Sequence, residues 1–160
     1  MQWQELVERQ PRLAATAHSR LIEPGVVLVA TLRRDGSPRL SPVEPFVLEG
    51  DLLLSMLWQS FKARDLLRDP RVYVHAPVTA KEGSPEFKLA GRATVLEDKA
   101  LRGKLDDLFW EMIEWRPAPD SHYFEFLAER AAWVTYDEGQ TSIRWRLGAE
   151  GEKRLYKPGI

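Results

Sequence analysis

The chain has 160 residues, a formal net charge of −1, 44% hydrophobic residues and no cysteine. This balance predicts one globular domain over residues 1–160 and excludes disulfides, thiolate metal sites and a cysteine nucleophile. The near-neutral charge lacks the basic field of a nucleic-acid-binding protein, and the three histidines show no metal-ligand spacing. No apolar run approaches the ~20 residues of a membrane helix and no signal-peptide pattern is present, so we expect a cytoplasmic protein without a membrane partner.

The first 24 residues are predicted to form a helical arm in two pieces. Apolar residues recur at helical spacing on both sides of Pro11, which interrupts the pattern. The apolar and β-branched run at residues 26–32 then predicts a buried strand. This strand opens the predicted barrel core, which covers residues 25–147.

Residues 39–48 are predicted to return as a second strand after a hairpin turn at residues 35–36. Two prolines, Pro42 and Pro45, lie inside this strand. Because proline cannot donate to a ladder, we expect the strand at a sheet edge, at a bulge or at a bend in a barrel corner. Irregular backbone of this kind leaves amides and carbonyls free for a ligand, although the local pattern favours an ordinary edge strand.

The stretch from residue 52 to residue 74 predicts strand, tight turn, short helix and strand. Residues 52–57 form an apolar run, Ser60 stands where a helix would begin, and its hydroxyl could cap the first free amides. Pro70 ends the helix, and residues 71–76 resume as a fourth strand.

The charges at the start of this short helix are unusual. Lys62 and Arg64 lie in its first turn, at the positive end of the helix dipole, which costs a few tenths to about 1 kcal/mol. An anion bound there would reverse the sign, since the amides, the Ser60 hydroxyl and both cations would face it. The alternative is two solvated cations balanced by Asp65 and Asp69.

The second half of the chain predicts a fifth strand at residues 86–96, in which Gly91 indicates a bulge or a close backbone approach. Residues 98–115 predict a helix capped by Asp98, with an apolar stripe expected in the core: Leu101, Leu105, Leu108, Phe109, Met112 and Ile113. Residues 121–130 are ambiguous between helix and strand.

The last part of the chain predicts a strand at residues 131–136 and a last strand at residues 141–147. Residues 148–160 are expected to form a polar tail on the surface or against a partner. Six or seven strands joined mostly by hairpins, with two or three helices, predict a mainly β fold: a small antiparallel barrel with helices outside.

With these residues in order, the chain resembles the pyridoxamine 5′-phosphate oxidase-like flavoproteins, the FMN-binding split-barrel family. The resemblance covers roughly residues 25–147 and depends on three segments in the family's order: residues 27–39, residues 60–72 and residues 89–93. It implies a Greek-key-like split β-barrel and an obligate homodimer, with FMN bound at the interface between the subunits.

The resemblance implies a set of cofactor contacts. Ser60 and Lys62 match the positions that hold the FMN phosphate, which favours the anion interpretation, and Arg39 matches an arginine that reaches the phosphate or ribityl end. The backbone along the flavin ring would come from one strand segment: Leu40, Ser41, Pro42 and Val43. The strand end beside the ring would be Ser55 and Met56. Phe61 departs from the family, because many oxidases carry a second basic residue there.

The last predicted strand contains residues that the resemblance assigns to the second subunit. Trp145 is the contact expected from that chain, together with Arg144 and Arg146, and the tryptophan is equally explained as interface core. No side chain indicates a general acid or base, so no catalytic residue is predicted.

The expected function is a flavin-dependent oxidoreductase acting on a small molecule. Two alternatives stay open. The first is a reductase that uses a deazaflavin coenzyme, because the arginine-rich pattern of residues 60–72 is also common in that branch. The second is a non-catalytic carrier or sensor that binds flavin, haem or another flat ligand.

Overall fold

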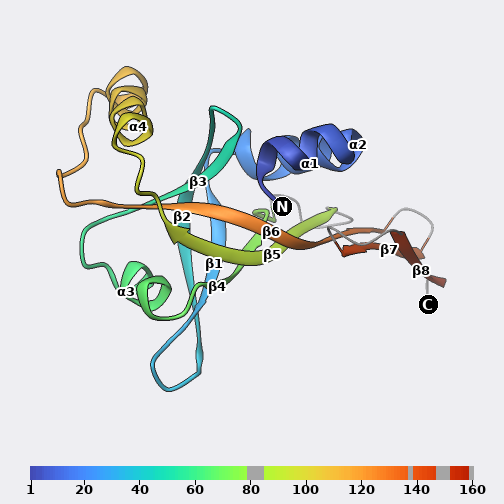
Figure 1. Ribbon diagram of the computed structural model, residues 1–160. Helices are drawn as coiled ribbons and strands as arrows, with labels where there is room; N and C mark the ends of the chain where they lie inside the picture. The colour runs from blue at the N-terminus through green and yellow to red at the C-terminus, as the bar shows by residue number, and fades with distance from the viewer. Residues whose placement is uncertain (79–84, 137–138, 147–151, 159–160) are drawn as a thin grey trace.

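The computed structural model describes residues 1–78, 85–136, 139–146 and 152–158. Within this part of the chain, six antiparallel strands close into a barrel (Figure 1). Around the barrel they lie in the order β3-β2-β1-β4-β5-β6, and pairing of β3 with β6 closes it. Their bounds are β1 Val27–Leu32, β2 Pro38–Leu48, β3 Asp51–Met56, β4 Arg71–His75, β5 Glu86–Val95 and β6 His122–Thr135. The predicted antiparallel barrel is confirmed.

The order of the first four strands is that of a Greek key, since β1, β2 and β3 follow one another through hairpins and β4 returns beside β1. Strand β2 changes partner along its length. Residues 38–43 pair with β1, whereas residues 44–48 pair with β3. The change falls between Pro42 and Pro45, which confirms the expected bend at a barrel corner. As a result, residues 38–43 have one edge that pairs with no other described strand.

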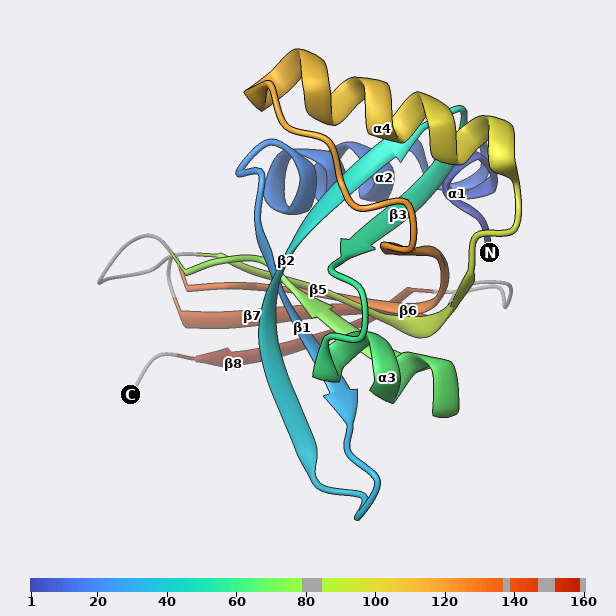
Figure 2. The same ribbon diagram turned by 90° about the vertical axis from the view of Figure 1, so that its left-hand side faces the viewer.

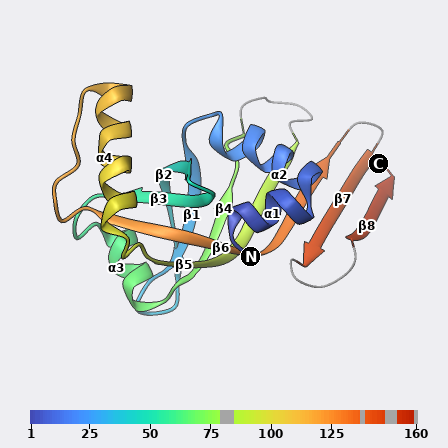
Figure 3. The same ribbon diagram turned by 45° about the horizontal axis from the view of Figure 1, so that its top comes forward.

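The long strand β6 joins two parts of the molecule. Its first residues, 122–125, pair with β3, and residues 130–135 pair with β7 (Gly139–Arg146). The ambiguous segment at residues 121–130 is therefore mostly strand, because a helix there would leave the edges of β3 and β5 unpaired. Figure 3 shows β7 and β8 extending from the barrel as a hairpin.

The strand predicted at residues 141–147 is confirmed as β7, but the prediction that it is the last strand is wrong, because β8 (Glu152–Pro158) pairs with β7. The residues predicted as a polar tail carry no alternating apolar pattern, so the sequence alone gives no strand signal. Backbone pairing along the free edge of β7 does not require such a pattern, because the ladder is made by amides and carbonyls.

Three short helical segments at the N-terminus confirm the two-piece arm: α1 Trp3–Arg9, α2 Pro11–Ala17 and the π-helical turn η1 His18–Ile22. The break comes at Pro11, which starts α2 at a position where its missing amide costs nothing. The arm buries Trp3, Leu6 and Leu13 in the main core. None of the described helices is long and apolar enough to span a membrane.

Helix α4 (Lys99–Ile113) covers a second, smaller core, and Figure 2 shows it lying across the ends of β2 and β3. Asp98 caps it as predicted, since its Oδ1 accepts from the amides of Ala100 and Leu101 at 2.8 and 3.1 Å. The buried side of α4 is made by Leu101, Leu105 and Phe109, with Leu108 partly buried.

The prediction that the whole apolar stripe of α4 lies in the core is wrong for the last turn of the helix. Met112 and Ile113 are each 61% exposed, whereas Phe109, one turn earlier, is buried against Phe46. The helix extends beyond the sheet that it covers, so its periodicity continues where there is nothing to pack against.

The predicted special role of Gly91 is confirmed by a register shift between β5 and β6. Ala90 pairs with Arg130 but Gly91 pairs with Ala128, so β6 contains one extra residue at this point. A Cβ atom on Gly91 would overlap the carbonyl oxygen of Leu127 across the ladder.

We expect Gly91→Ala to lower the free energy of unfolding by about 1–3 kcal/mol, because the added methyl forces the β5–β6 ladder apart. Urea denaturation monitored by tryptophan fluorescence measures this change. Gly103→Ala is the control: its Cβ meets nothing within 4 Å. In the interior of α4 this substitution should raise stability by up to ~1 kcal/mol. Equal stability of Gly91→Ala and the native chain would contradict the close approach.

Candidate functional site

The short helix α3 (Phe61–Arg68) begins where predicted, directly after Ser60. The chain enters it through a tight turn in which the amide of Ser60 donates to the carbonyl of Leu57 at 3.1 Å. The predicted cap is not formed, because the Ser60 side chain accepts no amide hydrogen bond. Its hydroxyl oxygen is buried and has no hydrogen-bond partner among the described residues. A buried unpaired hydroxyl is uncommon in proteins and calls for an explanation, of which an additional partner is one.

Lys62 lies in the first turn of α3 and reaches the free edge of β2. Its Nζ donates to the carbonyl oxygen of Pro42 at 2.6 Å. Partial burial lowers the pKa of Lys62, while Glu44 acts in the opposite direction. The ammonium therefore lies beside the Ser60 turn, partly removed from water and joined to a neutral carbonyl.

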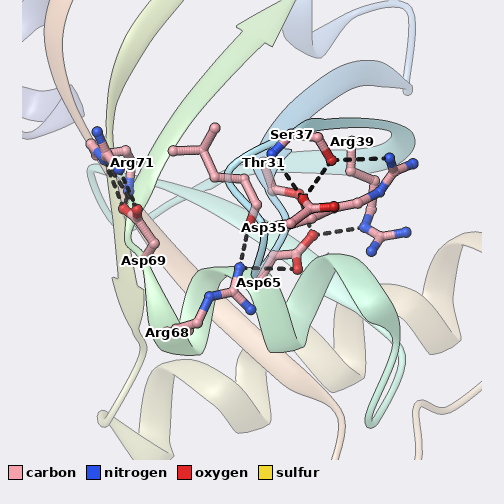
Figure 4. Close-up of polar contacts among 10 residues, drawn as sticks. Thr31, Asp35, Ser37, Arg39, Asp65, Arg68, Asp69 and Arg71 are labelled. Atoms are coloured by element: carbon pink, nitrogen blue, oxygen red, sulfur yellow. Dashed lines mark hydrogen bonds and ion pairs between the residues drawn. The ribbon is translucent and has the colours of Figure 1, made fainter.

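The buried carboxylate of Asp65 connects α3 to the barrel (Figure 4). It accepts from Thr31 Oγ1 at 2.9 Å, from Arg39 Nε at 2.7 Å and from Arg68 Nη2 at 3.3 Å. Arg68 also donates to the carbonyl of Leu32, so strands β1 and β2 and helix α3 are joined at one point.

The contacts of Asp65 decide its charge. Burial raises the pKa of Asp65, but hydrogen bonds from Arg39, Thr31 and Arg68 lower it by more, so the pKa lies below its usual value. The carboxylate is therefore ionised at neutral pH.

Asp65 and Asp69 do not balance the two cations at the start of α3. Asp65 pairs with Arg39 and Arg68, and Asp69 pairs with Arg71 at 2.6 Å, which holds the pKa of Asp69 at about 2 (Figure 4). Among the described residues, Lys62 and Arg64 form no ion pair.

Arg39 is placed beside the first turn of α3 by its bond to Asp65. Its guanidinium lies 5.0 Å from the ring centre of Phe61, within the range of a cation–π contact. Asp65 uses only Nε, and the two terminal nitrogens of Arg39 make no hydrogen bond to the described residues. The structure thus places Arg39 over Phe61, the residue that lies between Ser60 and Lys62 in the chain.

The other predicted contacts of the same subunit lie on β2 and β3. Leu40 and Pro42 are exposed, Ser41 is half-buried and Val43 is buried, as expected for alternating residues on a strand with one open edge. Ser55 and Met56 end β3 just before the turn that leads to Ser60. Met56 is only 2% exposed and packs in the main core.

Trp145 is not near these residues in the same chain, because α3 and β7 lie at opposite ends of the molecule (Figure 1). It pairs with Ala131 and packs partly against the main core. Arg144 and Arg146, its neighbours on β7, are exposed.

Sequence reasoning missed the connecting role of Asp65, Thr31 and Arg68. One signal was available, since Asp65 and Arg68 are three residues apart on a helix and so share a face. The partner Thr31 lies in an otherwise apolar strand, and only the fold brings it to Asp65.

The barrel and the α3 site can be compared with known proteins. Residues 13–135 match the family model of pyridoxamine 5′-phosphate oxidase. The chain belongs to the pyridoxamine 5′-phosphate oxidase family. The match includes every described barrel strand and α3, and it ends at the last residue of β6.

Solved structures agree with this family assignment. A pyridoxamine 5′-phosphate oxidase-related FMN-binding protein from Nostoc punctiforme is similar with a TM-score of 0.68 and 14% identity, over 98% of this chain and 100% of that chain. PhzG from Burkholderia lata, solved in complex with tetrahydrophenazine-1-carboxylic acid, has a TM-score of 0.63 and 16% identity over 96% and 92%. The heme storage protein HutZ from Vibrio cholerae has a TM-score of 0.58 and 17% identity over 75% and 89%. These similarities establish the fold, and no curated protein gives a significant sequence match.

We expect Asp65→Asn to lower the free energy of unfolding by about 3 kcal/mol near neutral pH, because it leaves Arg39 without its buried partner. The pKa of Asp65 is lower in the folded state than its usual value of 3.8. The ionised carboxylate therefore stabilises the fold at pH values above 3.8. This stabilisation is lost as the pH falls through the folded-state pKa. The stability gap between the native chain and Asp65→Asn should therefore be largest near neutral pH and shrink in acid.

Urea unfolding at a series of pH values measures this gap. Asp120→Asn, at an exposed residue without a hydrogen bond among the described residues, is the matched control and should change little. A gap that stays constant down to about pH 2 would contradict an ionised Asp65 with a depressed pKa.

Proposed function

We propose that this chain is a flavin-dependent oxidoreductase that holds the phosphate of FMN at the start of α3. The observation that carries the proposal is the buried Ser60 hydroxyl, which has no partner in the described part of the chain and lies next to the amides of the first helical turn. A phosphate there would accept from the hydroxyl and from those amides, and it would face the positive end of the helix dipole.

Two cations are available for the same phosphate. Lys62 is joined to a neutral carbonyl, and an anion is a stronger acceptor for an ammonium. Arg39 is oriented by Asp65 with its terminal nitrogens unused, so it loses little side-chain freedom on binding. Phe61 stands where many oxidases have a second basic residue, and Arg39 lies over its ring.

The open edge of β2 supports a place for the flavin ring. Residues 40–43 offer backbone groups beside Lys62, and the end of β3 at Ser55 and Met56 leads into the Ser60 turn. When bound, the flavin would supply the hydride chemistry. The chain's own contribution is then to hold the phosphate, to align the ring along β2 and to offer backbone hydrogen bonds to it.

We further propose that the chain is a homodimer. Trp145, Arg144 and Arg146 cannot reach α3 of their own chain, so a contribution to the site requires a second subunit (Figure 1). The outer sheet face that would meet this subunit carries large exposed side chains, with Leu40 64% and Tyr73 41% exposed. Exposed apolar side chains of this size on a sheet face support an interface.

Two alternatives share the same fold. A deazaflavin coenzyme also carries a phosphate and would use the same cradle. A carrier or sensor without turnover is supported by the similarity to the heme storage protein HutZ, which has the same fold.

The first experiment is the visible absorption spectrum of the purified protein, before and after incubation with FMN, with the deazaflavin coenzyme and with haem. We expect a flavin spectrum that survives desalting, with bleaching on addition of a nicotinamide donor. Uptake of the deazaflavin coenzyme but not of FMN would favour the deazaflavin-dependent reductase. A haem spectrum, or bound flavin that no nicotinamide donor reduces, would favour the carrier or sensor. Failure to bind any of these ligands would contradict the proposal.

We expect Lys62→Ala, alone or with Ser60→Ala, to weaken FMN binding tenfold or more, equivalent to about 1.4 kcal/mol. The cause is the loss of charge-assisted contacts to the phosphate. Fluorescence titration measures the affinity, and riboflavin, which has no phosphate, should bind the native chain and both variants equally. Lys99→Ala, at an exposed lysine without a described contact, is the control. Unchanged FMN affinity in both variants would rule out the phosphate cradle.

A further inference from the structure

A second group of cations lies beside the α3 site, around an open hollow of about 340 Å³ between α3 and the β1–β2 hairpin. Five arginines and two aspartates line it together with one aromatic ring: Arg33, Arg34, Arg39, Arg64, Arg68, Asp35, Asp65 and Phe61. We call this group the arginine hollow. It gathers three more positive than negative charges in a chain whose formal net charge is −1.

Both acidic side chains of the arginine hollow are already in use. Asp65 is bound by Arg39 and Arg68. Asp35 accepts from the amide and the hydroxyl of Ser37 at 2.9 and 2.7 Å, and these bonds lower its pKa. Asp65 is therefore paired with two arginines, whereas Asp35 has neutral donors and its charge acts on Arg33.

The remaining cations of the arginine hollow have weak partners or none. Arg33 donates to Ser37 Oγ at 3.3 Å. Within the part of the chain that the structure describes, Arg34 and Arg64 make no side-chain hydrogen bond and no ion pair. Guanidinium groups without a counter-charge around one hollow repel one another, and a bound anion would remove that cost.

The folded backbone, and not sequence proximity, gathers these cations. Arg33 and Arg34 lie at the hairpin turn, which is closed by a bond from the Arg33 amide to the Ser37 carbonyl at 2.8 Å. Arg64 belongs to α3, which Asp65 holds against the same hairpin (Figure 4). The two backbone elements are thus tied together with their cations facing one opening.

The arginine hollow adjoins the proposed phosphate cradle. Phe61 directly follows Ser60, is 67% exposed and forms a wall of the hollow, and Arg39 lies over its ring. A ligand whose phosphate binds at Ser60 and Lys62 would therefore lie next to Phe61 and Arg39, which are part of the lining of the hollow.

We propose that the arginine hollow is a second anion subsite, which binds a further phosphate or carboxylate group of the same small ligand. This inference rests on the proposed function, and it makes the preferred ligand a polyanion that extends beyond a single phosphate. Arg34 and Arg64 donate to the second group, while Arg39 lies between the two anionic groups.

The test uses inorganic tripolyphosphate and inorganic phosphate as probes, with binding measured by calorimetry at low ionic strength, where charge contacts are least screened. We expect tripolyphosphate to bind at least tenfold more tightly than phosphate. In the Arg34→Ala/Arg64→Ala variant this advantage should disappear. The control variant, Arg12→Ala/Arg92→Ala, removes two exposed arginines outside the hollow. It should still bind tripolyphosphate at least tenfold more tightly than phosphate.

Further measurements separate the arginine hollow from the cradle. FMN should bind Arg34→Ala, which leaves Arg64 in the first turn of α3, within twofold of the native affinity, and tripolyphosphate should still bind Lys62→Ala more tightly than phosphate. Arginine-dependent tripolyphosphate binding without any flavin binding would support the hollow while the proposed function fails.

Three outcomes would overturn the second subsite. The first is equal tripolyphosphate affinity in the native chain and Arg34→Ala/Arg64→Ala. The second is a loss of FMN affinity in Arg34→Ala as large as in Lys62→Ala, because the hollow would then belong to the first phosphate. A single-stranded oligonucleotide that competes with tripolyphosphate at equal phosphate concentration would assign the hollow to nucleic acid.

Discussion

The buried carboxylate of Asp65 is the contact on which the candidate site depends. It holds α3 against the barrel through Thr31, and it orients Arg39 on the neighbouring strand. A buried charge is tolerated only when its hydrogen bonds are complete, and here three donors from three elements complete them. Because these donors belong to β1, β2 and α3, satisfying one carboxylate also sets the relative positions of the two strands and the helix.

This arrangement separates cations that serve the fold from cations that are available for a ligand. Arg68 and the Nε of Arg39 are used by Asp65, whereas Lys62 has a neutral acceptor and Arg64 has none among the described residues. The helix start adds free amides and a buried hydroxyl at Ser60. That imbalance is the basis of the anion site that we propose at this end of the barrel, and a structurally similar protein is an FMN-binding relative of the family to which the chain belongs.

The barrel also explains why one chain does not bring all the predicted contacts together. Strand β2 changes partner between its two prolines, so its first half presents an open edge beside α3. Strand β6 pairs with β3 at one end and with β7 at the other, which carries Trp145 away from that edge. The outer sheet face between them carries exposed Leu40 and Tyr73, where we place the second subunit.

The sequence by itself determined the features that depend on short-range geometry. Among these are the hairpins, the Asp98 cap, the bend of the proline-containing strand, the close approach at Gly91 and the start of α3 at Ser60. The dipole argument at Lys62 and Arg64 needs only the position of a charge along a helix, and it left a bound anion and two solvated cations as alternatives. The family resemblance then favoured the anion. Only the tertiary structure decided that residues 122–135 form one strand, that β8 exists and that the last turn of α4 is exposed. Each of these depends on whether a distant partner is present to pair or pack with, as does the burial of Asp65 between segments more than 20 residues apart in the chain.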